Sequence, residues 1–300
     1  MKQEKYINLF TDFGFKKIFG SDYSKEILID FLNEVLSYND KNFSKITEIK
    51  YQNPINQGNS EEDSGAVFDL YCEAKDGERL IIELQNLKQY FFKDRSLYYI
   101  SFPIQEQSPK LRNWTYELSK IYFVGILNFK MDEEVPHFVR QVNLVDVSTN
   151  QIFYDKLKMV YLEMPKFSKS LNELESNFDC WMYVINNLHV LQEKPAPLQN
   201  RIFKKLFKFA EIAKLDKGER QMYNRSLKAQ WDRAAVMEYA VKEAAKEAAK
   251  EAAEKAAKEA TKEAEIRKSK EFALLMREKG EPMEKIIEYT GLTKQEIEKL

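Results

Sequence analysis

The chain has 300 residues, of which 44% are hydrophobic, so it can bury a sizeable core, and its length suggests about two domains. Its 47 lysines and arginines against 48 aspartates and glutamates exclude a uniformly basic protein that coats nucleic acid, but they leave room for a local basic patch. Two cysteines, Cys72 and Cys180, can form neither a disulfide framework nor a zinc site, and the lack of a membrane-spanning apolar stretch predicts a cytoplasmic protein without a membrane partner.

The first elements are a helix and a strand. Apolar residues recur at helical spacing over residues 24–36, with Ser24 as a candidate N-cap, and predict an amphipathic helix. A β-rich run at Ile46–Tyr51 predicts a strand. Residues 53–64 are polar and predict a mobile loop.

Residues 67–85 carry the most informative pattern, two alternating β-rich runs on either side of Lys75-Asp76-Gly77. An Asp-Gly pair between such runs is a strong hairpin signal. If the loop has two residues, Asp69 and Glu83 point to opposite faces of the hairpin. If it has three residues, with Gly77 in the left-handed conformation, Asp69 lies directly across from Glu83.

The hydrophobic pattern favours the three-residue loop, because a slip of one residue would put the apolar sets of the two strands on opposite faces of a half-buried sheet. The Cβ atoms of Asp69 and Glu83 then lie about 5 Å apart. Two carboxylates at that distance repel by roughly 3 kcal/mol at an effective dielectric near 20. Either one is protonated or a cation lies between them, and oxygen ligands in an open site suit Mg²⁺. The favoured register places on one face Phe68, Leu70, Cys72, Ala74, Leu80, Ile82 and Leu84, and on the other Asp69, Tyr71, Glu73, Ile81, Glu83 and Gln85.

Asp69, followed fourteen residues later by Glu83-Leu84-Gln85, resembles the D-(x)n-(D/E)-x-K signature of the PD-(D/E)XK nuclease superfamily, with glutamine in the place of lysine. The flanking segments Thr11–Gly20, Lys25–Asn33 and Phe92–Tyr99 resemble the recombination-promoting nuclease (Rpn) and transposase family. The resemblance covers residues 5–165 well and the whole chain loosely. It implies an α/β fold with a restriction-endonuclease-like mixed sheet, and a Mg²⁺-dependent DNA endonuclease linked to recombination or transposition.

The resemblance also implies roles for the motif residues. Asp69 and Glu83 would be metal ligands, and Gln85 would be the third catalytic residue. Glutamine is usual at this position in the family; its amide can orient water but cannot offer a positive charge. Lys88 and Lys93 are candidates for the missing cation and for contacts with DNA, with simple solvation as the alternative.

Other candidate contacts with DNA lie before and after the hairpin. Arg95 lies on a helix face with Tyr98 and Tyr99, and this face could clamp a phosphate, although Arg95 could equally pair with an acid. Lys16 and Lys17 could touch phosphates at the start of a helix or be solvated. Glu26 and Glu34 are weaker candidates for additional metal ligands, because related nucleases sometimes supply an acid from the first helix.

The rest of the core alternates helix and strands. We expect a helix near residues 88–107 and strands at Ile121–Leu127, Val142–Val147 and Met159–Leu162. This order predicts a mixed sheet covered by helices, within a nuclease-like core of residues 1–165.

The C-terminal half is predicted to be entirely α-helical: an extension at 166–238, a Lys/Glu/Ala-rich helical spacer at 239–271 and a small helix-turn-helix-like unit at 272–300. The alanine pairs of the spacer recur every four residues, so their stripe drifts by about 40° per repeat and forms no fixed seam. A lone solvated helix is the favoured interpretation, and self-association into a homo-oligomer is the alternative. For the terminal unit, a contact with protein is favoured over DNA reading, because its last helix carries two glutamates.

Two functions therefore compete. The first is a metal-dependent DNA endonuclease of low sequence specificity, because no element convincingly reads bases. The second is a catalytically inactive nuclease-like module for DNA binding or protein assembly, an alternative kept open by Gln85 and by the near-zero net charge.

Overall fold

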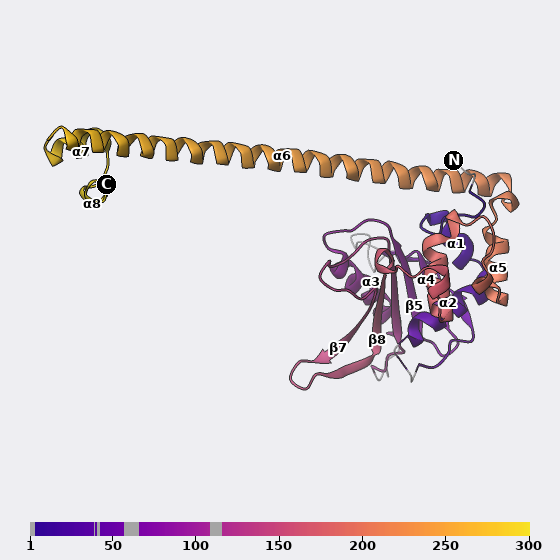
Figure 1. Ribbon diagram of the computed structural model, residues 1–300. Coiled ribbons are helices and arrows are strands. Elements are labelled where there is room, and N and C mark those ends of the chain that lie inside the picture. Colours follow the sequence, from indigo (N-terminus) through magenta and orange to yellow (C-terminus); the bar gives the residue numbers. More distant parts are fainter. Residues whose placement is uncertain (1–3, 39, 41–42, 57–65, 109–115) are drawn as a thin grey trace. The chain divides into compact units, whose positions relative to one another are not determined.

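The computed structural model describes residues 4–38, 40, 43–56, 66–108 and 116–300. The chain divides into two compact units, Met1–Gln230 and Trp231–Leu300. Figure 1 shows the order of their elements along the chain. The predicted four-part division at residues 165, 238 and 271 stays a prediction, and most of the expected mobile loop at 53–64 lies outside the described residues.

The first unit is built on a mixed six-stranded sheet with the strand order β1-β4-β5-β6-β8-β7. Strands β5, β6 and β8 are parallel neighbours, while β1, β4 and β7 pair antiparallel with their neighbours. This arrangement confirms the predicted mixed sheet. The strands are β1 (Ile49–Tyr51), β4 (Leu70–Ala74), β5 (Arg79–Gln85), β6 (Ile121–Leu127), β7 (Val139–Asp146) and β8 (Gln151–Glu163), with β2 (Ile55–Asn56) and β3 (Ala66–Val67) forming a separate pair.

The β4–β5 hairpin has the predicted three-residue loop. Leu70 pairs with Ile82, the Ala74 N–H donates to the Glu78 carbonyl at 2.9 Å, and Gly77 has a φ of +81°. A left-handed φ at this position is available to glycine without a steric penalty. The register is therefore the one that places both motif carboxylates on the same face.

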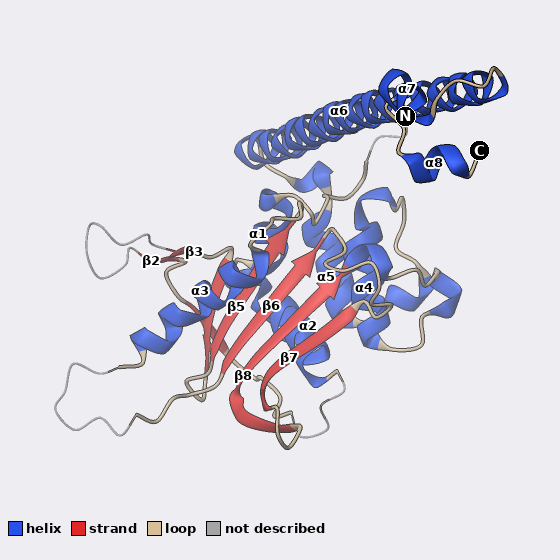
Figure 2. Cartoon of the chain, turned by 90° about the vertical axis from the view of Figure 1, so that its left-hand side faces the viewer, coloured by secondary structure: helices blue, strands red, loops and turns tan. Residues whose placement is uncertain are grey.

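Both faces of the sheet are buried over β4, β5 and β6, which corrects the expectation of a half-buried sheet. Helix α3 covers one face and four other helices cover the opposite one (Figure 2). Tyr71 and Ile81 consequently belong to a second apolar core beneath α3. Phe68 also lies in that core, not beside Leu70 as predicted, because the chain bends at Asp69 before β4 begins. The helices are α1 (Asp12–Phe19), α2 (Lys25–Ser37), α4 (Asn177–Asn187) and α5 (Arg201–Ala210) on one face and α3 (Phe92–Glu106) on the other.

Several elements begin at residues other than those predicted. Helix α3 begins four residues later than expected, at Phe92, and β8 begins at Gln151, eight residues earlier than the apolar run. The early part of β8 pairs with β7 in an exposed ribbon, so its side chains do not show the apolar pattern on which the prediction depended. Short 3-10 helices connect other elements: η1 (Asp22–Ser24), η2 (Met164–Lys166), η3 (Leu171–Glu173), η4 (Leu188–Val190), η5 (Ala196–Leu198) and η6 (Ile212–Lys214).

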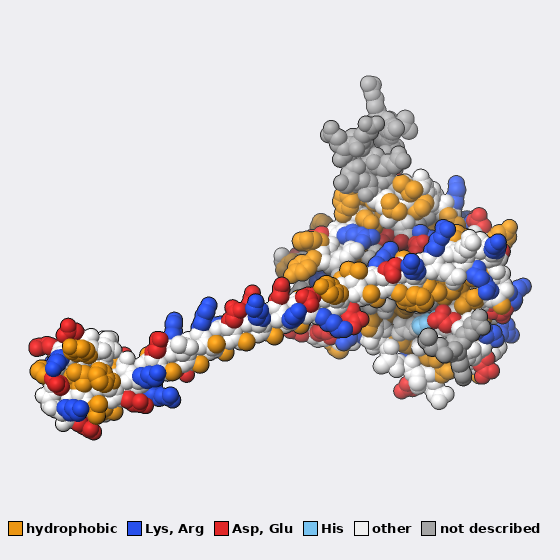
Figure 3. Space-filling model, turned by 90° about the horizontal axis from the view of Figure 1, so that it is seen from above, with side chains coloured by type: hydrophobic (Ala, Val, Ile, Leu, Met, Phe, Trp, Pro, Cys, Tyr) orange, Lys and Arg blue, Asp and Glu red, His pale blue; other side chains and the backbone are white. Residues whose placement is uncertain are grey.

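The Lys/Glu/Ala-rich segment belongs to one continuous helix, α6 (Lys217–Glu278), of 62 residues. Figure 3 shows basic and acidic side chains interspersed along it, and Lys242 pairs with Glu238 one turn away at 2.6 Å. Helices α7 (Met283–Thr290) and α8 (Lys294–Glu298) pack with the end of α6 around a small core that includes Met276 and Ile297. Within the described part of the chain, no helix combines the length and apolar character that a membrane crossing requires.

Candidate active site

The motif carboxylates face each other where the backbone ladder of the hairpin ends. Asp69 lies in the bend just before β4, and Glu83 lies near the end of β5. The Leu84 N–H donates to Asp69 Oδ2 at 2.7 Å, and the Asp69 N–H donates to Glu83 Oε1 at 3.1 Å. Each side chain thus accepts a bond from the backbone of the opposite segment, and these two bonds hold the carboxylates close together.

Burial disfavours the charged forms of both carboxylates in this pair. The Glu83 side chain is 2% exposed, and burial, with the nearby Asp69 carboxylate as the next cause, raises the pKa of Glu83 to about 8. Burial also raises the pKa of Asp69, against the lowering effect of the Leu84 hydrogen bond. Two converging carboxylates in a low-dielectric setting favour a bound cation or a shared proton. Their oxygens are hard donors, so the pair fits a divalent ion such as Mg²⁺ that keeps several waters.

Gln85 lies on the same face as Glu83, as the strand period requires, and is also buried. Its Nε2 donates to Glu83 Oε2 at 3.2 Å. An amide has a second N–H and an oxygen, which are groups that can position a water molecule beside the carboxylates.

Arg95 of α3 brings a positive charge to the pair. Its Nη2 lies 3.4 Å from Glu83 Oε2, its Nη1 donates to Gln89 Oε1 at 2.9 Å, and its guanidinium lies 4.8 Å from the centre of the Tyr99 ring. Tyr99 is thus beside Arg95 as predicted, and Tyr98, the other predicted neighbour, packs edge-on against a phenylalanine one turn along α3. The positive charge missing from the motif position is therefore supplied from the helix that covers this face.

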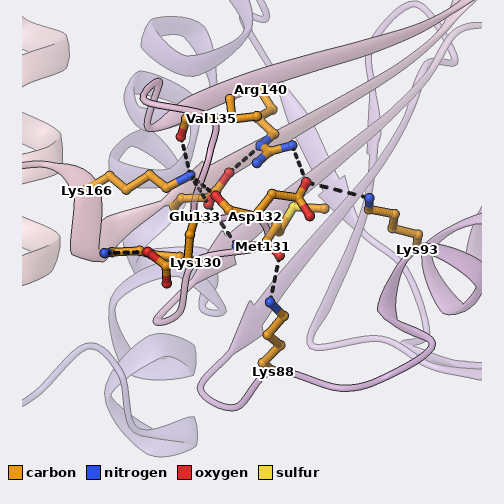
Figure 4. A network of polar contacts seen from close by, with 10 residues as sticks. Lys88, Lys93, Lys130, Met131, Asp132, Glu133, Val135, Arg140 and Lys166 are labelled. Carbon is orange, nitrogen blue, oxygen red and sulfur yellow. Dashed lines mark hydrogen bonds and ion pairs between the residues drawn. The ribbon is translucent and has the colours of Figure 1, made fainter. Parts of the chain in front are cut away.

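Lys88 and Lys93 lie at a different place. Lys88 Nζ donates to the Met131 carbonyl at 2.7 Å, and Lys93 Nζ lies 3.7 Å from Asp132, which also binds Arg140 at 2.8 Å (Figure 4). The structure thus brings the two lysines to the segment that follows β6. Arg95, and not Lys88 or Lys93, is the cation that lies beside Glu83.

The same network is centred on Glu163, which is fully buried at the end of β8. Glu163 pairs with Arg140 and with Lys166, the latter at 2.6 Å, and accepts a hydrogen bond from the Met131 N–H at 2.8 Å. Sequence reasoning missed this cluster, because its members come from three separate segments and have no characteristic spacing.

Lys16 and Lys17 lie in the last turn of α1, which corrects the expectation that they begin a helix. Thr11 caps the helix by accepting a bond from Gly14, so the first turn starts at Asp12. Lys16 pairs with Asp12 at 2.7 Å, and both are near enough to Asp69 to act on its pKa, the lysine lowering it and the aspartate raising it. Asp12 was not identified from the sequence, although it stands in the quoted Thr11–Gly20 segment.

Glu26 is directed elsewhere. It pairs with Arg201 at 2.6 Å and with Lys205, both on α5, and the Lys205 hydrogen bond lowers its pKa. Among the described residues, no group of three or more acidic, histidine or cysteine side chains is arranged to hold a metal. A metal at Asp69 and Glu83 would therefore complete its coordination with water or substrate oxygens.

Comparison with known families now identifies the fold and the class of protein. The family model for PD-(D/E)XK nuclease family transposases matches residues 9–240. The chain belongs to this family. Its mixed sheet with flanking helices is accordingly the restriction-endonuclease-like fold, as the motif resemblance implied. PD-(D/E)XK nucleases generally use divalent metal ions. Searches among curated proteins and among solved structures returned no significant match.

Proposed function

We propose that this PD-(D/E)XK family member is a Mg²⁺-dependent DNA endonuclease of low sequence specificity that acts in recombination or transposition. The observation that carries the proposal is the pair Asp69–Glu83, whose carboxylates converge in a buried, cation-deficient position beside Gln85 and Arg95. A purely structural acid pair would gain nothing from this arrangement, because like charges at close range destabilise the fold.

Each side chain has a role in phosphodiester hydrolysis. Asp69 and Glu83 would hold the ion, which would supply a Lewis acid for the phosphate and a bound water of lowered pKa. The Gln85 amide orients the attacking water. Arg95 offers the phosphoryl oxygens a charge-assisted contact, because a guanidinium has five N–H groups. The water oxygen bonds to phosphorus as the bond between phosphorus and the 3′ oxygen breaks; the attacking water gives up a proton to solvent, and the leaving 3′ oxygen takes up a proton from solvent.

Low specificity is supported by the nature of the basic groups near the site. Contacts of lysine and arginine side chains with backbone phosphates carry no base information by themselves. The terminal unit offers little for reading bases, because its last helix, α8, has five residues and carries Glu296 and Glu298. Such enzymes often use two active sites to break both strands, so we also propose that a homo-oligomer forms through the C-terminal helices.

The proposal is tested by incubating supercoiled plasmid and Mg²⁺ with the parent protein, Asp69→Asn, Glu83→Gln and Asp76→Asn. The last is a matched control, because Asp76 is exposed in the hairpin loop. We expect nicking by the parent and the control, and none by the other two. Equal nicking by all four proteins would indicate a contaminating nuclease. Binding of DNA without nicking by the parent would support the inactive-module alternative, and a competing RNA in the same reaction tests the choice of nucleic acid.

A further inference from the structure

Helix α5 has an unusually basic outer face. Its ten residues, RIFKKLFKFA, include four cations and no acid. Phe203, Leu206 and Phe207 are buried against the core of the first unit, whereas Lys204 and Lys208 are exposed one turn apart. Side chains at this spacing lie about 5–6 Å apart and present their charges together.

These lysines line a hollow in the surface of the first unit. The hollow has an apolar wall formed by Phe209 and Leu215. Lys205 lies over the Phe209 ring at 5.7 Å from its centre, so its stem packs against this wall. The cations that line the hollow are Lys17, Lys204, Lys205, Lys208 and Lys214.

Only part of this charge is neutralised by the protein. Lys17 pairs with Glu219 of α6, and Lys214 pairs with Glu211 at 2.7 Å. Lys205 shares Glu26 with a neighbouring arginine. For Lys204 and Lys208, no acidic partner is found among the ion pairs of the described residues. Exposed cations gathered around one hollow create a local positive potential that favours a polyanion.

The hollow is connected to the carboxylate pair through α1. Lys16 is near enough to Asp69 to act on it electrostatically, and the next residue, Lys17, lines the hollow. Consecutive helix residues point about 100° apart. The last turn of α1 thus carries one lysine near the carboxylate pair and the next at the hollow.

We propose that this lysine hollow binds backbone phosphates of the DNA that extends beyond the cleavage site. The inference rests on the proposed function, because it assigns the path of the substrate of that same site. Lysine suits such contacts because it is a flexible point charge that binds phosphate without reading the base. The contacts therefore add affinity and leave sequence preference low.

The test measures binding of a fluorescent 30-base-pair duplex by anisotropy, with the full chain and with EDTA present to prevent cleavage. The variant is Lys204→Gln/Lys208→Gln. The control, Lys45→Gln/Lys75→Gln, changes the net charge equally at exposed lysines outside the hollow, and Lys75 lies in the loop at the opposite end of β5 from Glu83. Loss of two phosphate contacts should reduce the slope of log K against log salt by about 1.8 and weaken binding at 0.1 M salt by roughly tenfold or more, while the control follows the parent.

The outcomes separate this inference from the proposed function. If the parent binds DNA but Lys204→Gln/Lys208→Gln keeps the affinity and salt slope of the control, the hollow is not on the DNA path and only the inference is overturned. If the parent neither binds nor cuts DNA, the proposed function fails and the inference fails with it. Lys204→Arg/Lys208→Arg should restore binding, which separates lost charge from a folding defect. Inorganic tripolyphosphate provides a second probe: a thermal shift abolished by the Gln substitutions, with DNA affinity unchanged, would assign the hollow to a small anion instead.

Discussion

At the scale of single residues, burial of the two carboxylates in the candidate site lowers the stability of the fold. Glu83 is buried beside Asp69, and its pKa of about 8 lies well above the 4.5 of a free glutamate. The folded chain therefore retains a proton that the unfolded chain releases, so this group makes the fold less stable as pH rises from about 4.5 to about 8.

Glu83→Gln should remove that dependence. In metal-free buffer the free energy of unfolding of the variant should be close to that of the parent at pH 5. At pH 8.5 it should be higher than that of the parent. Urea unfolding followed by tryptophan fluorescence measures this, since Trp181 is fully buried in the core. Asp76→Asn serves as the control. A stability difference that does not change between the two pH values would contradict the assigned environment of Glu83.

A divalent ion should offset the loss of stability that the buried carboxylates cause at high pH. Because an ion that binds only the folded state stabilises it by mass action, Mg²⁺ should raise the unfolding midpoint of the parent at pH 8.5. Glu83→Gln and Asp69→Asn should respond much less. The same titration with Asp76→Asn tests for nonspecific salt effects, and an equal response of all four proteins would place the ion elsewhere.

We expect Arg95, which lies beside Glu83, to supply the positive charge that the motif glutamine cannot offer. Replacing a charged donor to the transition state typically costs 10²–10³-fold in rate, so we expect a loss of about that size for Arg95→Ala in the nicking rate at saturating DNA. Arg95→Lys should retain part of the activity, since it keeps the charge but loses the planar fork. Lys93→Ala is the comparison. A larger loss for Lys93→Ala than for Arg95→Ala would return the role to the lysine.

At the scale of elements, the hairpin loop determines whether the site exists. The three-residue loop with Gly77 at positive φ places both carboxylates on one face, and every residue of β4 and β5 depends on that register. The local sequence predicts this register because turn chemistry and apolar alternation act over a few residues. Helix α3 covers the second face of the sheet and buries Tyr71 and Ile81 there, and this packing depends on the tertiary structure.

Deletion of Lys75 tests this dependence. A two-residue loop would either shift the register by one, turning Asp69 and Glu83 to opposite faces, or strain the backbone to keep it. We expect the deletion to abolish nicking and to lower the free energy of unfolding, whereas Lys75→Ala should do neither. Both variants are compared by plasmid nicking and urea unfolding. Full activity in the deletion variant would mean that the register does not control the site.

At the scale of the whole molecule, the long helix α6 belongs to both compact units and presents mostly charged residues and alanine over its Lys/Glu/Ala-rich segment. Pairs such as Lys242–Glu238 support an isolated helix by a few tenths of a kcal/mol each. They fit the favoured interpretation of a lone solvated helix, and self-association stays a prediction that sedimentation velocity can measure.

Ala253→Pro should break α6 locally without affecting the first unit. A proline inside a helix costs about 3 kcal/mol, so far-ultraviolet circular dichroism should show lost helix. The unfolding midpoint followed by tryptophan fluorescence should equal that of Ala253→Gln, and so should the nicking rate, because nicking cuts one strand and needs one active site. If Ala253→Pro lost nicking activity and also formed a smaller assembly in sedimentation velocity, self-association through α6 would be needed for cleavage.

The sequence by itself determined the features that depend on neighbours along the chain: the hairpin register, the shared face of Asp69, Glu83 and Gln85, and the long alanine-rich helix. Periodicity and turn chemistry suffice there, because the physical interactions are local. Only the tertiary structure brought Arg95 to Glu83, directed Lys93 to the segment after β6 and gathered Lys17 with the lysines of α5. These groups lie on different elements, and their charges meet only after the sheet and its covering helices have packed.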